Sequence, residues 1–265
     1  MDLGLADARV VVQGGTQGMG RAAARCFADD GARIAVLART QADLDATCAE
    51  LLERGAPEAI ALRADITDLA AVGAAFADVG ERWGELNVLV NATGPTGIGG
   101  GIEDLSDDQW IETIEIGAMG MIRCVRAAIP LLRKAEWARI VNVSAHSTKR
   151  QSERLIAYTA AKAMVTSATK NLSLALAKDE ILVNTVSPGS FATETLKAWA
   201  EAAGIDSTDL YAIMAGIDEH FGHPAHLPRA GDPEEIGPVI AFAASRRNSY
   251  MTGANINVDG GSDFT

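Results

Sequence analysis

Short runs of apolar, β-branched residues alternate in this sequence with longer segments of helical periodicity, and this alternation constrains the fold more than any other feature. Most runs are continuously apolar rather than alternating, which is typical of strands buried on both faces. We expect strands at residues 9–13, 33–38, 58–64, 86–91, 138–144, 181–187 and 255–258. We expect helices at about 19–30, 41–54, 68–83, 107–134, 153–178 and 233–245. Strict alternation predicts right-handed crossovers, and therefore an α/β, doubly wound fold whose seven-stranded parallel sheet carries helices on both faces.

One long segment, residues 190–229, lies outside this alternation. It is apolar, with few charges, and we expect a partly helical excursion that acts as a lid and substrate wall. Its three histidines, at positions 220, 223 and 226, raise the question of a metal site. Gly222 and Pro224 prevent the three from sharing one regular helical face, so we expect no metal there.

Composition and charge exclude several classes of protein. A net charge of −12 disfavours a nucleic-acid partner, because such proteins carry a basic stripe that neutralises phosphates. No apolar run approaches the roughly 20 residues that span a bilayer, and residues 1–10 do not read as a secretory signal. Cys26, Cys48 and Cys124 lie singly in helix-like segments, which is typical of packed thiols in a reducing compartment. We therefore expect a cytoplasmic protein without a membrane segment, and one domain over residues 1–265 because no linker divides the chain.

The turn after the first strand is rich in glycine. Gly14, Gly15, Gly18 and Gly20 fall where a doubly wound sheet places its usual phosphate site. Glycine allows a tight turn, brings backbone N–H groups close to an anion, and lets the following helix pack on the sheet. This turn therefore predicts a local anion site in an otherwise acidic protein.

Gly14-x-x-x-Gly18-x-Gly20 resembles the glycine motif of the short-chain dehydrogenase/reductase family. The resemblance continues through NATG (91–94), YTAAK (158–162), SPGSFAT (187–193) and TGANINVDGG (252–261), which together cover nearly the whole chain. It implies a Rossmann fold and an NAD(P)-dependent oxidoreductase that interconverts a ketone and a secondary alcohol. The whole chain most resembles the branch of 3-oxoacyl-thioester (acyl-carrier-protein) reductases.

Tyr158 and Lys162 make chemical sense without the family. Residues four apart share a helix face, so the ammonium group can lie near the phenol. A nearby cation lowers a phenol pKa from about 10, which would make Tyr158 the proton donor in ketone reduction and the acceptor in alcohol oxidation. The resemblance adds that Lys162 hydrogen-bonds the nicotinamide ribose.

The family's catalytic serine position falls on Ala145. A hydroxyl is needed there to hydrogen-bond the carbonyl oxygen as charge develops. Ser144 and Ser147 flank the position: Ser144 is nearer, whereas Ser147 would share the face of Ala145 if the strand continued. Either could replace the missing hydroxyl, and we favour Ser144. His146 is expected to line the pocket or to be solvated rather than to act as the acid.

A second departure from the family pattern is Gly117, which stands where an asparagine usually supports a proton relay. A glycine within a helix costs about 1 kcal/mol relative to alanine, so Gly117 and Gly120 predict close packing or a local helix distortion. Family members commonly form tetramers through the two long helices, here 107–134 and 153–178. We expect the small-residue face at Gly117 and Gly120 to suit such a homotetramer.

Cofactor choice rests on the end of the second strand. An acidic residue there would bind the ribose hydroxyls of NAD, but this chain has Ala38 followed by Arg39. A guanidinium group suits a phosphate, so we expect NADP rather than NAD. Thr40 is expected to cap the next helix, with Asp43 completing a capping box.

The resemblance also assigns the other cofactor contacts. Asp65 and Ile66 are expected beside the adenine, Asn91 beside the ribose, and Phe191 and Thr193 near the carboxamide. The full predicted cofactor site is Gly14, Thr16, Gln17, Gly18, Met19, Arg39, Asp65, Ile66, Asn91, Tyr158, Lys162, Pro188, Gly189, Phe191 and Thr193, and the catalytic set is Ser144, Tyr158 and Lys162. A different class of function remains open at this point: a non-catalytic NADP-binding sensor or assembly protein that kept the cleft after losing the serine and the asparagine.

Overall fold

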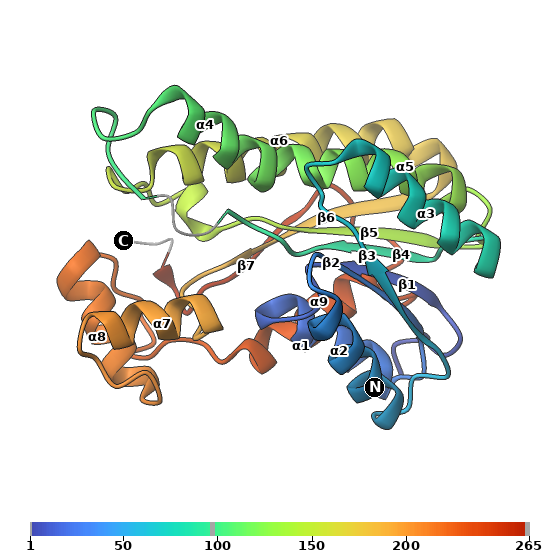
Figure 1. Ribbon diagram of the computed structural model, residues 1–265, viewed down its shortest axis with the longest axis horizontal. Coiled ribbons are helices and arrows are strands. Elements are labelled where there is room, and N and C mark those ends of the chain that lie inside the picture. The colour runs from blue at the N-terminus through green and yellow to red at the C-terminus, as the bar shows by residue number, and fades with distance from the viewer. Residues whose placement is uncertain (1, 96–98, 263–265) are drawn as a thin grey trace.

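A computed structural model describes residues 2–95 and 99–262 of the chain. Its centre is a parallel sheet of seven strands in the order β3-β2-β1-β4-β5-β6-β7 (Figure 1). The strands are β1 (Arg9–Gln13), β2 (Arg33–Ala38), β3 (Ala59–Arg63), β4 (Val88–Asn91), β5 (Ala138–Val143), β6 (Ile181–Pro188) and β7 (Asn255–Val258). The predicted α/β fold with a seven-stranded parallel sheet is confirmed.

Helices cover both faces of this sheet (Figure 1). One face carries α1 (Gly18–Asp29), α2 (Gln41–Glu53) and α9 (Pro233–Ala244); the other carries α3 (Leu69–Trp83), α4 (Asp107–Ile114), α5 (Gly120–Leu132) and α6 (Ile156–Leu176). Successive residues of a strand pack alternately into the hydrophobic cores on the two faces of the sheet. Val11 packs into the α3–α5 side, whereas Val10 and Val12 pack into the α1–α9 side. This two-sided burial explains why the strands are continuously apolar rather than alternating.

The predicted helix at 107–134 is interrupted. A π-helical turn, Glu115–Met119, separates α4 from α5. At Gly117 an added Cβ would lie 2.9 Å from the Cβ of Ala161 in α6, and at Gly120 it would lie 2.4 Å from Cδ1 of Ile66. The expected close packing and helix distortion are both found. Because both glycines are packed inside this chain, the prediction that they form an intersubunit face is wrong.

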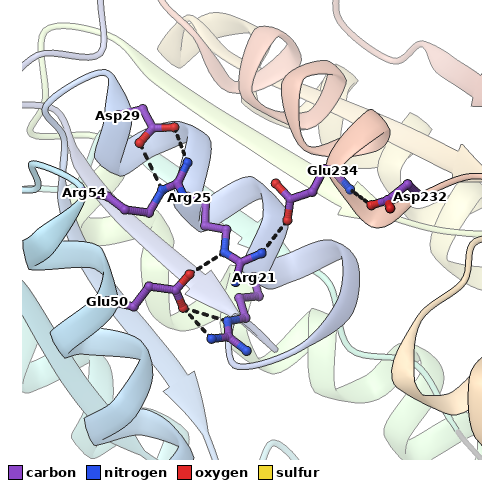
Figure 2. A network of polar contacts seen from close by, with 7 residues as sticks. All are labelled: Arg21, Arg25, Asp29, Glu50, Arg54, Asp232 and Glu234. Carbon is purple, nitrogen blue, oxygen red and sulfur yellow. Dashed lines mark hydrogen bonds and ion pairs between the residues drawn. The ribbon is translucent and has the colours of Figure 1, made fainter. Parts of the chain in front are cut away.

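A network of charged side chains fixes α1 against its neighbours (Figure 2). Glu50 of α2 accepts hydrogen bonds from Arg21 and Arg25 of α1, and Arg25 also pairs with Glu234 of α9. Burial alone would raise the pKa of Glu50, but the hydrogen bonds from Arg25 and Arg21 lower it below its ordinary value. The network therefore holds α1, whose first residues belong to the glycine-rich turn, in one orientation between α2 and α9.

The segment predicted as a lid forms α7 (Glu194–Ala202) and α8 (Leu210–Phe221) at one end of the sheet (Figure 1). It has a small apolar cluster of its own, made by Ala192, Ala200, Ile213, Met214, Ile217 and Ala230. The segment leaves and rejoins the fold at one place, because Phe191 forms a β-bridge with Gly231. Within the described residues, no helix is both long and apolar enough to cross a bilayer.

Candidate active site

A cleft of about 1480 Å³ opens where the carboxyl ends of the strands meet the lid. Its wall contains every predicted site residue except Asn91. The Asn91 side chain instead donates to Oδ1 of Asn142 at 2.8 Å between β4 and β5, and is 3% exposed. This geometry gives Asn91 a structural place in the sheet and does not support the predicted cofactor contact.

The glycine-rich turn has the shape that a bound pyrophosphate requires. Gly14 and Gly18 have φ angles of +78° and +51°, which disfavour residues with a side chain. A Cβ at Gly20 would lie 2.2 Å from the carbonyl oxygen of Gly14, so α1 packs directly on the turn. Gln17 precedes α1 and makes no side-chain cap, which leaves the first N–H groups of the helix without that partner. The turn therefore fits a dinucleotide cofactor.

Two arginines meet at the end of β2. The Arg39 side chain is exposed and lines the cleft. Arg63 is the register partner of Ala38 in β3, and its Nε donates to the backbone oxygen of Arg39 at 3.3 Å. Sequence reasoning missed Arg63, because only the strand register places it beside Arg39. The predicted capping box is wrong, since Thr40 makes no side-chain cap to α2.

Asp65 lies between this arginine pair and the middle of the cleft. Its Oδ1 accepts from the backbone N–H and the hydroxyl of Thr67, at 2.9 and 2.8 Å. The Thr67 hydrogen bonds lower the pKa of Asp65, and the nearby Arg39 adds to this effect. Asp65 is therefore ionised and preoriented at the edge where the adenine is expected.

Lys162 is buried beside Tyr158 but is held by backbone oxygens. Its Nζ donates to the carbonyl oxygens of Val143 at 2.9 Å and Thr93 at 3.3 Å. A Cβ at Gly94 would lie 3.2 Å from this Nζ, so the NATG turn both receives the ammonium group and makes room for it. Burial lowers the pKa of Lys162 to about 8.

Tyr158 lines the cleft from the first turn of α6. Burial raises the pKa of Tyr158 to about 12, opposite to the predicted direction. The reason is that the Lys162 ammonium group is engaged by Val143 and Thr93 and does not offset the loss of water around the phenol. Tyr158 is therefore in its protonated form at neutral pH, as a proton donor must be.

The Ser144 hydroxyl is hydrogen-bonded within the protein. Its Oγ donates to the backbone oxygen of Lys162 at 2.8 Å and lies 2.8 Å from Oγ1 of Thr166. Both hydrogen-bond partners of the Ser144 hydroxyl therefore belong to α6. Its geometry therefore does not support the predicted catalytic role. Ser147 is 2% exposed and accepts a hydrogen bond from Thr159 at 3.4 Å. The strand does not continue through Ser147, because a short 3₁₀ helix forms at His146–Thr148. The side chains of Ala145 and Ser147 therefore do not share a strand face.

His146 lines the cleft next to Ala145, as predicted for a pocket residue. Its Nδ1 lies 3.1 Å from the backbone oxygen of Pro188. The lid histidines point elsewhere: Nδ1 of His220 contacts the oxygen of Gly216, and Nε2 of His223 contacts the oxygen of Gln151. Among the described residues, no group of three or more potential metal ligands comes together.

The sixth strand and the base of the lid close the far side of the cleft. A Cβ at Gly189 would lie 2.6 Å from the Cα of Asp259, so the Pro188-Gly189 turn packs directly on the chain after β7. Thr193 approaches the glycine-rich turn, with Cγ2 3.1 Å from the Cβ position of Gly18. The lid adds Leu196, Trp199 and Phe221 to the wall.

A doubly wound sheet with this glycine turn and a Tyr-x-x-x-Lys pair in the cleft defines a class of nicotinamide-dependent oxidoreductases. A family model described as "Enoyl-(Acyl carrier protein) reductase" (adh_short_C2) matches residues 14–263. The chain belongs to the short-chain dehydrogenase/reductase family, as the sequence motifs predict. It is an NAD(P)-dependent dehydrogenase acting on CH–OH groups, and this favours the catalytic interpretation over a sensor or assembly protein.

Individual relatives cover almost the whole chain. Trans-4-hydroxycyclohexanecarboxylate dehydrogenase of Sinomonas cyclohexanicum is 34% identical, over 97% of this chain and 93% of that protein. Meso-2,3-butanediol dehydrogenase of Serratia marcescens is 32% identical, over 95% and 93%. The crystal structure of L-sorbose reductase from Gluconobacter frateurii, complexed with NADPH and L-sorbose, is 27% identical and superposes with a TM-score of 0.91 over 100% of both chains. These similarities do not single out the 3-oxoacyl-thioester branch.

Proposed function

We propose that this protein is an NADP(H)-dependent oxidoreductase that interconverts a ketone and a secondary alcohol, with Tyr158 transferring the proton. The observation that carries the proposal is the position of Tyr158 in the wall of the cleft, one helical turn before the buried Lys162. The cofactor, when bound, exchanges a hydride with the substrate carbon. In reduction Tyr158 gives its proton to the carbonyl oxygen and regains one from solvent; in oxidation it accepts the hydroxyl proton.

Lys162 supports this step by its position. Its ammonium group is held by the carbonyl oxygens of Val143 and Thr93. The resemblance implies that Lys162 hydrogen-bonds the nicotinamide ribose. A pKa of about 8 keeps most of the group charged at neutral pH, so Lys162 supplies a positive charge in the wall of the cleft. The Ser144 hydroxyl holds α6 against the end of β5 and so positions both residues.

The test of the proposed function is a titration of the purified protein into NADPH, followed by nicotinamide fluorescence and then by addition of candidate ketones. The panel contains an α-hydroxy ketone, a ketose, a cyclohexanone carboxylate and a 3-oxoacyl thioester. We expect an enhanced signal that decays with at least one class. A signal that rises and then stays constant with every ketone, together with no reduction of NADP by the matching alcohols, would contradict the proposal.

The preference for NADP over NAD is proposed from the arginine pair. Arg39 lines the cleft beyond β2, where the 2′-phosphate of NADP is expected, and Arg63 lies against its backbone on the neighbouring strand. Both side chains are exposed, and an arginine fork binds phosphate with charge-assisted hydrogen bonds. Arg63 does not itself line the cleft, and we propose that its side chain can reach the same phosphate and supply the second cation that Gln17 does not.

We expect Arg39→Ala to weaken NADPH binding by about 10- to 100-fold and NADH binding by less than about twofold, since one charge-assisted hydrogen bond is lost with NADPH alone. Arg63→Ala should have the same selectivity with a smaller loss. Fluorescence titration with each cofactor measures both. Arg82→Ala is the matched control, because Arg82 is an exposed arginine on α3 that pairs with Asp78 and does not line the cleft. Equal losses of both cofactors in Arg39→Ala would contradict this assignment.

We also propose that the chain is one NADP-binding domain with a lid at 190–229, and that four copies form a homotetramer. With Gly117 and Gly120 packed internally, the support for assembly comes from exposed apolar side chains on α4 and α6: Ile111, Met164 and Leu174. Light scattering of the purified protein should give the mass of four chains. A monomeric mass that persists at high protein concentration would contradict this proposal.

A further inference from the structure

The hydrogen bond to Pro188 determines which tautomer of His146 is present. The backbone oxygen of Pro188 can only accept, so the Nδ1 atom 3.1 Å away must carry the proton. In a neutral ring Nε2 is then an acceptor with a free lone pair. In the described part of the chain, Nε2 of His146 has no hydrogen-bond partner. The cleft wall therefore presents an acceptor, and not a donor, at this place.

The surroundings of His146 keep the ring neutral. Burial lowers the pKa of His146, and the neighbouring His223 and Arg150 lower it further. The Pro188 oxygen and Asp259 act in the opposite direction but do not reverse the shift. His223 lies with its ring centroid 6.2 Å from that of His146, edge to face. At neutral pH the ring is uncharged, and the acceptor on Nε2 persists.

His146 lies next in sequence to the residue where the reacting carbonyl is expected. His146 directly follows Ala145, the residue at the family's catalytic serine position, and consecutive Cα atoms are about 3.8 Å apart. Ala145 and His146 both line the cleft, so a substrate whose carbonyl oxygen lies at Ala145 can bring a group on the neighbouring carbon to His146. Leu155, Leu196 and Trp199 line the same cleft. An acceptor without a partner in the protein favours a substrate that carries a hydroxyl donor there.

We propose that His146 accepts a hydrogen bond from a hydroxyl group next to the reacting carbon, so that the substrates are α-hydroxy ketones and the corresponding vicinal diols. This inference rests on the proposed function and adds the substrate class to it. His146 is thereby a specificity-determining residue, distinct from the proton donor Tyr158.

The test compares acetoin with its O-methyl ether, which has the same carbon skeleton but no hydroxyl donor. At about pH 8 the wild-type protein should reduce acetoin with a kcat/KM at least about tenfold higher, the value of one hydrogen bond to a buried acceptor. His146→Ala should bring this ratio close to one. His223→Ala is the matched control and should keep the ratio, because His223 adjoins His146 but does not line the cleft.

A measurement on the wild-type protein makes the test independent of how the variants fold. Protonation of His146 turns Nε2 into a donor, which a methyl ether satisfies as well as a hydroxyl does. Because the pKa of His146 is below its ordinary value of about 6.5, the preference for acetoin should be complete at about pH 8 and should be lost only at a pH below the ordinary histidine range.

The outcomes separate this inference from the proposed function. Reduction of both ketones at equal rates by the wild type, or an unchanged ratio in His146→Ala, would overturn the assignment of His146 and leave the function standing. A weaker affinity of His146→Ala for NADPH with an unchanged ratio would also overturn it, because His146 would then hold the cofactor. Turnover of no member of the ketone and alcohol panel would instead overturn the proposed function.

Discussion

Tyr158→Phe is expected to lower kcat for ketone reduction by about 10²- to 10⁴-fold, the range that positioned proton donors contribute. The substitution removes only the hydroxyl, and the ring that packs at the start of α6 remains. NADPH affinity should change by less than about twofold, since the glycine turn and the arginine pair that are proposed to hold the cofactor are untouched. Single-turnover absorbance at the nicotinamide band measures the rate, and fluorescence titration measures the affinity.

Tyr250→Phe provides the control for this result. Tyr250 is 97% exposed and does not line the cleft, so the same chemical change should leave kcat and affinity as in the wild type. A Tyr158→Phe variant that keeps more than about a tenth of the wild-type kcat would show that another group delivers the proton. With a pKa of about 12, the Tyr158 phenol is protonated at neutral pH and has a proton to donate.

The sheet and most of the cleft could be predicted because their signals are local. Neighbouring residues alone are enough to predict the strand at Arg9–Gln13 and the tight turn with glycines at 14, 18 and 20. The same holds for Gly117 and Gly120, whose cost within a helix already indicated close packing. The packing partners, Ala161 and Ile66, could not be predicted, since they come from elements distant in sequence. Because Ala161 and Ile66 fill the space beside the two glycines, the glycines pack within this chain and do not form an intersubunit contact.

The predictions that failed depend instead on contacts between residues that are distant in sequence. Ser144 was favoured on its distance along the chain from Ala145, but its hydroxyl is taken by the backbone of α6, which no sequence pattern reports. The pKa of Tyr158 was expected to fall because Lys162 is four residues away. In three dimensions the Lys162 ammonium group points to the ends of β4 and β5, so burial dominates. Arg63 was missed because strand register, not spacing, brings it to Arg39.

The loss of the serine hydroxyl at Ala145 leads to the second large expectation, a gain of activity. Ala145 lies in the wall of the cleft, is 4% exposed, and has extended backbone angles that serine adopts without strain. Neither neighbouring hydroxyl replaces it, because Ser144 is bonded to α6 and Ser147 is buried against Thr159. We therefore expect Ala145→Ser to raise kcat by about 10- to 100-fold, below the full value of an oxyanion donor because the surrounding wall was not shaped for it.

Ala145→Cys is the matched control, since a thiol has a similar shape but is a weak donor and should leave kcat near the wild-type value. Gly117→Asn should not add to the gain, because its Cβ would lie 2.9 Å from Ala161 and 3.1 Å from Pro95, and the asparagine of the family has no room there. Steady-state kinetics with the best substrate of the panel measures all three variants. An unchanged or lower kcat in Ala145→Ser would show that Tyr158 alone carries the developing charge on the substrate oxygen, and that this cleft has dispensed with the second donor.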